Sequence, residues 1–483
     1  MKISKKFKLD RTQSELDFID IDINKDMPLF IDPYRISKLS GPYIDEANSI
    51  INNYFSYLIE LLSVGEYNKA RLIFTHLNEV NETCLGYSKN KPRGNGMGIK
   101  KASDFFSAIV HSKAIKYGII QSIEDIRVFV DGIDADRLSD MTSNIIRKFL
   151  IEYTQNQCKL FNIPLTSGVA SGMYWDVNSR SWKQEYTDML VINNKKYLLV
   201  PKIFVTYGDR INAGDYYNQF VLDFLQSENI RNQSEIVQYR KGEKNRGQPF
   251  VTKKDIHEKQ LKSEISNDGL KEWLAGFTRA HSRVFLNFKE KSFSRMKDVD
   301  FDEDRAKIAD YLIQKLKSIK KGVENASEYQ LTIMCILEFI YYPSISNPQM
   351  EREINDGRKR IDIFFNNTSN KGFFYDLFEK YNIPANFIIA ECKNYSTDVK
   401  NPEIDQLIGR FSKHRGKFGL SLSRSCLNKV LLYKRCTDVL LDSDNLIIPL
   451  FDDDIIQMLE AIKECNDISE SLLLSKYTEI AGR

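Results

Sequence analysis

The sequence predicts an α/β fold for the last third of the chain, a mixed sheet flanked by helices, behind an α-rich α+β N-terminal module. Two apolar runs, 358–365 and 386–394, are rich in β-branched and aromatic residues and predict strands. Amphipathic helical patterns lie on either side, most clearly at 328–342 and at 402–411, where Pro402 suits the first turn of a helix. The 483 residues are enough for two or three domains.

The N-terminal module is expected to begin with paired strands around 17–23 and 28–33, because apolar and polar residues alternate in the first of these runs. Helical patterns dominate the next part of the chain. The clearest helices are 47–63, 102–117 and 140–160. The pattern then changes to strands, and 186–192 with 196–202 predicts a hairpin, since two Asn residues stand between them.

Three parts are expected along the chain. They are a mostly helical module of residues 1–163, an α+β region of residues 164–300 that contains a basic loop, and the α/β domain of residues 301–483. The charged stretch 289–304 marks the last boundary, and an amphipathic helix at 306–320 follows it. The last part is on the scale of a single domain.

Composition predicts a soluble, cytoplasmic protein. Hydrophobic residues make up 42% of the chain and charged residues 28%, which are ordinary values for a globular protein with large cores. No apolar run approaches the roughly 20 residues that span a bilayer, and the basic N-terminus lacks the apolar segment of a signal peptide. The seven cysteines are scattered without CxxC spacing, which favours reduced thiols over a zinc site or a disulfide framework.

Three charged residues interrupt the two apolar strands. Asp362 is in the first strand, and Glu391 and Lys393 end the second, where alternate residues share a face. Charges in an apolar strand need partners. If the strands are adjacent, two carboxylates and an ammonium converge at one point, and carboxylate oxygens are the ligands that Mg²⁺ prefers. A structural ion cluster at a sheet edge is the alternative explanation.

These charged strands resemble the core motif of the PD-(D/E)xK nuclease superfamily, which has the restriction-endonuclease-like fold. That fold has the order helix, three strands, helix, strand. The matching segments are the helix 328–342, the strands 350–354, 358–365 and 386–394, the helix 402–411 and the strand 417–424. Gln406 stands where members resembling Holliday-junction resolvases and Mrr-type restriction enzymes keep a glutamine, and Ile361 replaces the usual proline before the first acid. For the acid of the helix the sequence offers Glu328 and Glu338. Glu328 fits the position better and is counted with the catalytic residues.

The resemblance implies a Mg²⁺-dependent endonuclease that also accepts Mn²⁺. Asp362, Glu391 and the carbonyl of Cys392 would hold the metal. Lys393 would orient the attacking water or help to deprotonate it, and Gln406 would support Lys393 or the phosphate. DNA is the expected substrate, although the chemistry does not itself exclude RNA. The domain arrangement also resembles nucleases of bacterial antiphage defence, which implies an N-terminal module that senses a trigger, such as a partner protein, and regulates cleavage.

Local basic runs, rather than the net charge of +3, predict the contacts with nucleic acid. The residues expected to contact the phosphate backbone are Arg358, Lys359, Arg360, Lys413, Arg415 and Lys417. Both runs are expected to flank the metal site. A turn-rich basic stretch, 239–247, predicts a further exposed loop that contacts DNA, and for any single run a solvated loop is the alternative.

Several alternatives stay open. Glycines and lysines in 91–101 precede a helix, as in a phosphate cradle, but the nucleotide-binding patterns are broken and an exposed loop is the simpler interpretation. Arg137, Asp140 and Asn144 share a helical face, which favours capping with an ion pair over a binding face. The protein could instead be a catalytically silent nucleic-acid sensor built on a nuclease fold, although the intact Lys393 argues against this. A homodimer also remains open.

Overall fold

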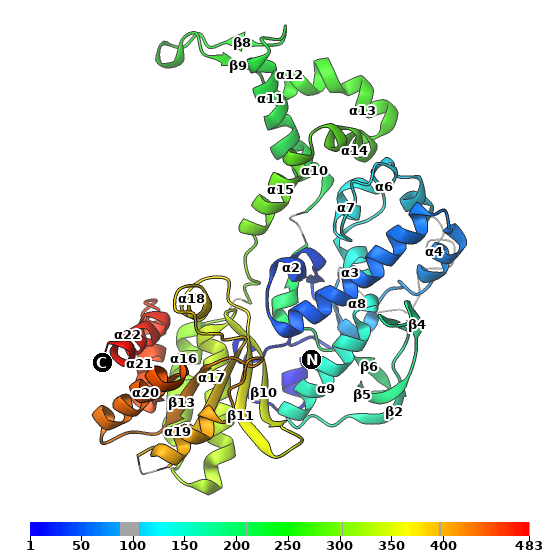
Figure 1. Ribbon diagram of the computed structural model, residues 1–483. Coiled ribbons are helices and arrows are strands. Elements are labelled where there is room, and N and C mark those ends of the chain that lie inside the picture. The colour runs from blue at the N-terminus through cyan, green and yellow to red at the C-terminus, as the bar shows by residue number, and fades with distance from the viewer. Residues whose placement is uncertain (87–105, 209–210, 302, 396–397, 483) are drawn as a thin grey trace.

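The chain forms a mixed α/β structure with two hydrophobic cores and a protruding helical arm (Figure 1). The computed structural model describes residues 1–86, 106–208, 211–301, 303–395 and 398–482. One core runs from Ile3 to Phe288, and the other runs from Ile308 to Ile480. The first core crosses the expected boundary at 163/164 without interruption, and the gap between the two cores coincides with the charged stretch 289–304. None of the helices in the described ranges is long and apolar enough to cross a membrane.

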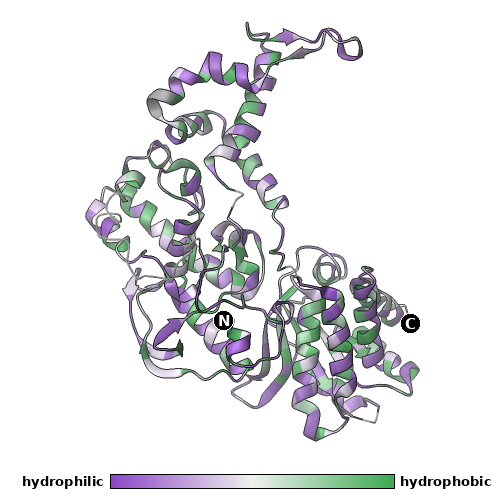
Figure 2. Ribbon diagram, turned by 180° about the vertical axis from the view of Figure 1, so that it is seen from behind, coloured by the Kyte–Doolittle hydropathy of each residue, from purple (hydrophilic) through white to green (hydrophobic). Residues whose placement is uncertain are grey.

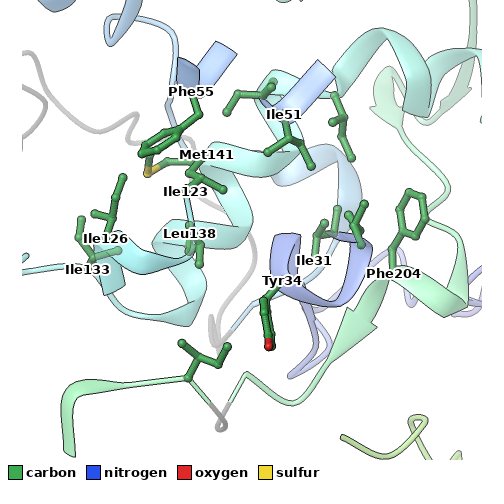
Figure 3. Packing of buried hydrophobic residues seen from close by; sticks show 14 of the residues in the cluster. Ile31, Tyr34, Ile51, Phe55, Ile123, Ile126, Ile133, Leu138, Met141 and Phe204 are labelled. Atoms are coloured by element: carbon green, nitrogen blue, oxygen red, sulfur yellow. The ribbon is translucent and has the colours of Figure 1, made fainter. Parts of the chain in front are cut away.

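Helices form most of the N-terminal module. Its longer helices are α2 (Pro33–Lys38), α3 (Pro42–Ser63), α4 (Tyr67–Ile73), α7 (Asp125–Phe129), α8 (Ala135–Ile145) and α9 (Arg147–Leu160). Buried apolar residues at helical spacing give α3 one apolar face, and Ile51 and Phe55 of that face pack near Met141 of α8 (Figure 3). The helices expected at 47–63 and 140–160 are thus confirmed, the second as two helices, and the loop 91–101 lies outside the described residues.

Short strands complete the N-terminal module. They are β1 (Phe30–Ile31), β2 (Thr166–Ala170), β3 (Tyr174–Asp176), β4 (Ser181–Lys183), β5 (Tyr186–Ile192), β6 (Lys195–Tyr197) and β7 (Val205–Thr206). The hairpin expected about the Asn pair is confirmed, because β5 and β6 pair antiparallel. The strand expected at 17–23 is wrong. Within that run the structure has only isolated bridges, from Phe18 to Pro201 and from Asp22 to Lys2. Most apolar side chains of the run are buried in the core, although no strand of the described residues pairs continuously with it.

The arm leaves the body after β7 and returns before the second core (Figure 1). Its α-helices and strands are α10 (Ala213–Asp215), α11 (Leu222–Arg231), β8 (Gln238–Tyr239), β9 (Pro249–Phe250), α12 (Lys253–Ile256), α13 (Lys262–Asp268), α14 (Leu270–Ala280) and α15 (Ser282–Ser294). Two π-helical segments, Tyr216–Val221 and His257–Leu261, connect α10 to α11 and α12 to α13. The base of the arm is fixed to the body because Lys289 forms ion pairs with Glu124 (3.1 Å) and Asp125 (2.7 Å).

A five-stranded sheet forms the C-terminal domain, in the order β10-β11-β12-β13-β14. Its strands are β10 (Ile345–Ile354), β11 (Lys359–Asn367), β12 (Phe387–Lys393), β13 (Phe418–Ser423) and β14 (Leu446–Phe451). The first two pairings are antiparallel and the last two are parallel, so the sheet is mixed as expected. β12 to β14 are almost completely buried, which matches their continuous apolar sequences.

Helices flank this sheet. They are α16 (Arg305–Ser318), α17 (Ala326–Tyr341), α18 (Phe373–Glu379), α19 (Asn401–Ile408), α20 (Lys429–Ser443), α21 (Asp452–Lys463) and α22 (Ser469–Ala481). α19 lies close against β13, where a Cβ on Gly419 would come within 3.0 Å of the Phe411 ring and 3.1 Å of Leu407. The helices expected at 306–320, 328–342 and 402–411 are therefore confirmed, with shifts of a few residues at their ends.

The two bodies meet through a buried polar contact. Lys202 of the N-terminal module pairs with Glu338 of α17 at 2.8 Å, and both side chains are almost fully buried. Asp17 accepts hydrogen bonds from the Tyr153 hydroxyl (2.6 Å) and from the backbone N–H of Asn347 in β10 (2.9 Å). The C-terminal domain is thus held against the N-terminal module by groups that have been removed from water.

Candidate active site

Asp362 and Glu391 lie side by side at the point where β11 and β12 separate. The antiparallel ladder ends at the pair Ile363 and Ala390, and the next residues on the two strands are these two acids. One oxygen of Asp362, Oδ2, accepts a hydrogen bond of 2.9 Å from the backbone N–H of Cys392. Asp362 is half-buried, whereas Glu391 is only 2% exposed. The expected convergence of the two carboxylates is confirmed by this geometry.

Lys393 and Gln406 bind the same oxygen of Glu391. The Lys393 ammonium donates to Glu391 Oε1 at 2.9 Å and to Gln406 Oε1 at 3.2 Å, and the Gln406 amide donates to the same Glu391 oxygen. Glu391 and Lys393 share a face because they are two residues apart in a strand. α19 supplies Gln406 from above that face, and Glu403 caps this helix by accepting from the backbone N–H of Lys400 at 2.9 Å.

Burial and mutual charge set the ionisation of this group. Burial raises the pKa of Glu391, and the neighbouring Asp362 carboxylate raises it further, while the charge on Lys393 opposes the rise. Burial alone would lower the pKa of Lys393, but the Glu391 carboxylate outweighs it and the pKa is raised. Lys393 is therefore a cation at neutral pH. It can donate hydrogen bonds to a water or to a phosphate.

The donor set fits a hard divalent cation. Glu391 Oε2 is buried and has no hydrogen-bond partner in the described structure, and an unpartnered buried carboxylate oxygen is costly unless something binds it. The N–H and C=O groups of one residue in a strand point toward the same neighbouring strand. Because the Cys392 N–H donates to Asp362, the Cys392 carbonyl also points toward β11. The described residues contain no cluster of three His, Cys, Asp or Glu side chains placed to hold a metal. A metal bound at Asp362 and Glu391 would therefore be held by two carboxylates, the Cys392 carbonyl and waters, a set of oxygen ligands that suits Mg²⁺.

The helical acid expected at the site is not part of this cluster. Glu328, in the first turn of α17, forms an ion pair with Lys315 of α16 and is about half exposed. Glu338, the other candidate, is buried against Lys202 at the contact between the two bodies. No described contact joins either acid to Asp362 or Glu391. In this structure Glu328 lies apart from the two acids, because Lys315 on the adjacent helix binds its carboxylate.

The two basic runs lie at different ends of the sheet. Lys359 is near the acids, since it is three residues before Asp362 and its ammonium donates to the Gly409 carbonyl at the end of α19, at 2.9 Å. Arg360 pairs with Glu351 at 2.8 Å, and Arg358 lies within 3.5 Å of Asp356. These three residues of the run 358–360 belong to the β10–β11 hairpin beside the site.

The second run, with Lys413, Arg415 and Lys417, is remote from the acids. The carbonyl of Arg415 accepts from the N–H of Phe387, which begins β12, at 3.3 Å. Glu391 is four residues further along, or roughly 13 Å at the rise of a strand. The expectation that this run flanks the metal site is wrong, because β13 is parallel to β12 and the loop before β13 lies at the opposite end of the sheet.

Two residues of the site were missed in the sequence. Arg410 is 9% exposed, its Nε has no described partner, and its charge lowers the pKa of Glu391 against the effect of burial. It is four residues after Gln406 in the run expected to be helical, and this spacing was the available signal. Ser423 pairs with Lys393 across the parallel ladder, and its hydroxyl is buried without a described partner. Its signal was the alternation of serine and leucine in 420–423.

A cavity of about 510 Å³ lies in the N-terminal module, far along the chain from the acids. It is lined by polar and charged side chains, among them Arg147, Glu82 and Lys196. Arg147 pairs with Glu82 at 3.0 Å, and Lys196 lies 3.8 Å from the same carboxylate. Asn144 lines the cavity, whereas Arg137 and Asp140 of the helical face expected from the sequence are not among its lining residues.

Comparison with known proteins matches part of the chain to a protein family. A family described as a domain of unknown function (DUF8370) matches residues 8–212, which contain most of the N-terminal module and its cavity. Neither a curated protein nor a solved structure matches the chain. The matched segment ends where the arm begins and spans the expected boundary at 163/164.

Proposed function

We propose that the C-terminal domain is a metal-dependent endonuclease that hydrolyses phosphodiester bonds in DNA. The observation that carries the proposal is the buried Glu391, whose Oε2 has no described partner while Lys393 and Gln406 hold its other oxygen. Glu338, buried in its ion pair with Lys202, also has a carboxylate oxygen without a described hydrogen-bond partner, so the second carboxylate beside Glu391 is what distinguishes it as a metal ligand. Asp362 beside it supplies a second ligand oxygen.

The reaction divides among this chain's own residues as follows. Asp362, Glu391 and the Cys392 carbonyl would hold Mg²⁺, or Mn²⁺ in its place. When bound, the ion neutralises the scissile phosphate and lowers the pKa of a water ligand. The cationic Lys393 donates to the attacking water or to the developing phosphorane oxygen. Gln406 keeps Lys393 against Glu391, so that the ammonium does not need to reorient during the reaction.

The order of elements supports the same proposal. α17, β10, β11, β12, α19 and β13 follow the order helix, three strands, helix, strand of the restriction-endonuclease-like fold, with α18 inserted between β11 and β12 and with the acids where these two strands diverge. The absence of Glu328 from the cluster is a departure from the superfamily pattern. Two carboxylates and a backbone carbonyl are nevertheless enough for a Mg²⁺ that retains several waters.

A regulatory role for the N-terminal module is part of the proposal. The module is larger than DNA docking alone requires, and it has a polar cavity of its own. A nuclease of this kind would endanger the DNA of its own cell, so we propose that the module restrains cleavage until a trigger binds, as in bacterial antiviral defence. The buried contact through Lys202 and Glu338 is the connection through which restraint would act.

Cleavage assays test the proposal directly. Full-length protein is incubated with supercoiled plasmid, linear duplex and single-stranded RNA, each with Mg²⁺, Mn²⁺ or EDTA. We expect nicking or cutting of DNA with either metal and none with EDTA. Cleavage of RNA alone would replace DNA as the substrate. Failure to cut any substrate, together with no metal binding by calorimetry, would instead favour a silent nuclease fold that serves as a scaffold.

A further inference from the structure

The tip of the helical arm is a two-stranded β-ribbon that projects away from both cores. β8 and β9 pair through Gln238 with Phe250 and through Tyr239 with Pro249. Figure 1 shows the hairpin at the far end of the arm, beyond α11 and α12, and Figure 2 shows that hydrophilic residues predominate along it. The ribbon covers no part of either core, so its sequence is not explained by a need to bury apolar surface.

The ribbon is held rigidly at both ends. Beyond the paired residues, Arg240 and Gln248 continue the ladder with a backbone hydrogen bond of 3.0 Å, and the N–H of Gly247 donates to the Arg240 carbonyl at 3.0 Å. At the stem, the Gln238 amide donates to Asp255 of α12 at 3.0 Å. A ribbon fixed in this way presents its loop side chains in a defined arrangement, which lowers the entropic cost of binding.

The loop 240–247 contains four cations and one acid, Glu243, so its net charge is positive. Arg240, Lys241, Lys244 and Arg246 are exposed, and none forms an ion pair with an acidic side chain in the described part of the chain. Other cations of the arm differ in this respect. Lys253 pairs with Asp223, and Lys259 pairs with Asp255. The four loop cations are thus left available for an external anion.

Aromatic side chains lie beside these cations. The Arg240 guanidinium stacks over the Phe250 ring at 5.2 Å, which fixes its direction. Tyr239 is 59% exposed, so its ring is available for contact with a ligand. The combination of oriented cations with an exposed aromatic ring is typical of nucleic-acid contacts, and a two-stranded ribbon has dimensions that the major groove of duplex DNA admits.

We propose that the β8–β9 hairpin is a docking element for duplex DNA and that its four loop cations contact phosphates on the duplex. The proposal rests on the proposed nuclease function in taking the same duplex as substrate. It adds a second contact, carried by a separate part of the molecule, that has no catalytic group. Because phosphate contacts carry no sequence information, the hairpin would raise affinity for duplexes in general and hold DNA for the C-terminal domain.

Binding in EDTA separates docking from cleavage. Affinity of the full-length protein for a fluorescent duplex is measured by anisotropy across a series of salt concentrations. The hairpin variant carries Arg240→Ala, Lys241→Ala, Lys244→Ala and Arg246→Ala. The matched control carries Lys5→Ala, Lys6→Ala, Lys8→Ala and Lys25→Ala, which removes the same charge from exposed positions on the N-terminal module.

We expect the hairpin variant to bind at least about tenfold more weakly at 0.1 M salt, and the slope of log K against log salt to decrease by about 3 to 4. The control should change neither quantity appreciably. With Mg²⁺, the variant's KM for plasmid should rise while its rate at saturating plasmid stays unchanged. The reason is that the hairpin's contacts stabilise the bound substrate and the transition state equally. Melting temperatures confirm that both variants are folded.

The possible outcomes distinguish this proposal from the proposed function. Unchanged affinity and slope in the hairpin variant, or an equal loss in the control, would overturn the docking role even if the protein cleaves DNA. Weaker binding only to single strands or RNA would overturn it as well. If the wild type cuts nothing but the hairpin variant alone loses duplex binding with the expected slope, the docking role stands and the nuclease proposal fails.

Discussion

Glu391 is the residue on which the proposed chemistry of the C-terminal domain depends. It is buried, and the charges of Asp362, Lys393 and Arg410 all act on its ionisation. Such a group is expensive to maintain, since a buried charge is tolerated only with partners. Its partners hold one oxygen and leave the other free, so the side chain is oriented before a ligand arrives. Preorganisation of this kind is what a metal site requires of its ligands.

The ligand residues give the first prediction. Asp362→Ala and Glu391→Gln should each reduce cleavage by at least about a thousandfold, because loss of one ligand removes several kcal/mol of charge stabilisation in the transition state. Plasmid cleavage under single-turnover conditions measures the loss, and circular dichroism checks the fold. Glu328→Gln is the matched control and should cut at the wild-type rate, since Glu328 contacts Lys315 instead. Wild-type rates in either ligand variant would rule out the site.

Lys393 gives a second prediction at the same scale. Lys393→Met should lose most of the cleavage rate yet retain metal binding, because the ammonium is a donor and not a ligand. Metal titration by calorimetry measures binding separately from catalysis. Metal affinity should even increase slightly, since the cation that competes for Glu391 is gone. Complete loss of metal binding in this variant would contradict the role assigned to Lys393.

At the scale of elements, α19 determines how the strand residues are used. Its N-terminus is fixed by Pro402 and by the cap of Glu403 on Lys400, and its apolar side packs on Gly419. The helix thereby holds Gln406 over the end of β12, where it bridges Lys393 and Glu391. Packing of one short helix therefore positions a lysine on a different element.

This arrangement predicts the behaviour of Gln406 variants. Gln406→Leu should lower kcat by roughly 10- to 100-fold, the usual cost of removing a group that orients a ligand, while KM for DNA and overall stability change little. Gln406→Asn, which keeps the amide on a shorter side chain, should recover little of the activity. A Gln406→Leu protein with normal kcat would show that the amide does not position Lys393.

The whole molecule is held together by charges that were removed from water. Lys202 forms its ion pair with Glu338 and also lies 4.1 Å from the centre of the Tyr342 ring, so one cation joins the N-terminal module to α17. Burial raises the pKa of Glu338 to about 7, although Lys202 opposes the rise. A carboxyl with a raised pKa in the folded state binds its proton more tightly when folded. Its contribution to stability is therefore lost as pH rises from about 4.5 to about 7.

Replacing Lys202 should reduce the stability of the protein in a pH-dependent way. In Lys202→Met the pKa of Glu338 should rise further. At pH 6 the Glu338 carboxyl is then protonated and neutral, so the substitution should lower the free energy of unfolding only slightly. At pH 8.5 an uncompensated buried carboxylate should cost about 3–5 kcal/mol. Denaturant unfolding at the two pH values measures this difference, and adding Glu338→Gln should remove most of it. An equal loss at both pH values would mean that Glu338 does not carry the effect.

The sequence by itself determined the local parts of this site. Alternation within 386–394 puts Glu391 and Lys393 on one face of a strand in any fold, and the apolar run around Asp362 requires a buried partner. The helices and strands expected between residues 306 and 424 followed from the same short-range periodicity, whereas α18, α20, β14 and α22 were not predicted. These features depend on neighbours within a few residues, so they can be recognised without knowing how the chain folds.

Only the tertiary structure decided which distant groups meet. Because β12 and β13 are parallel, Lys413, Arg415 and Lys417 lie at the end of the sheet opposite the acids. Because α16 packs beside α17, Glu328 forms an ion pair with Lys315. The same holds for the projection of the 239–247 loop on an arm. Such contacts depend on strand direction and helix packing over long separations in sequence, which local patterns do not encode.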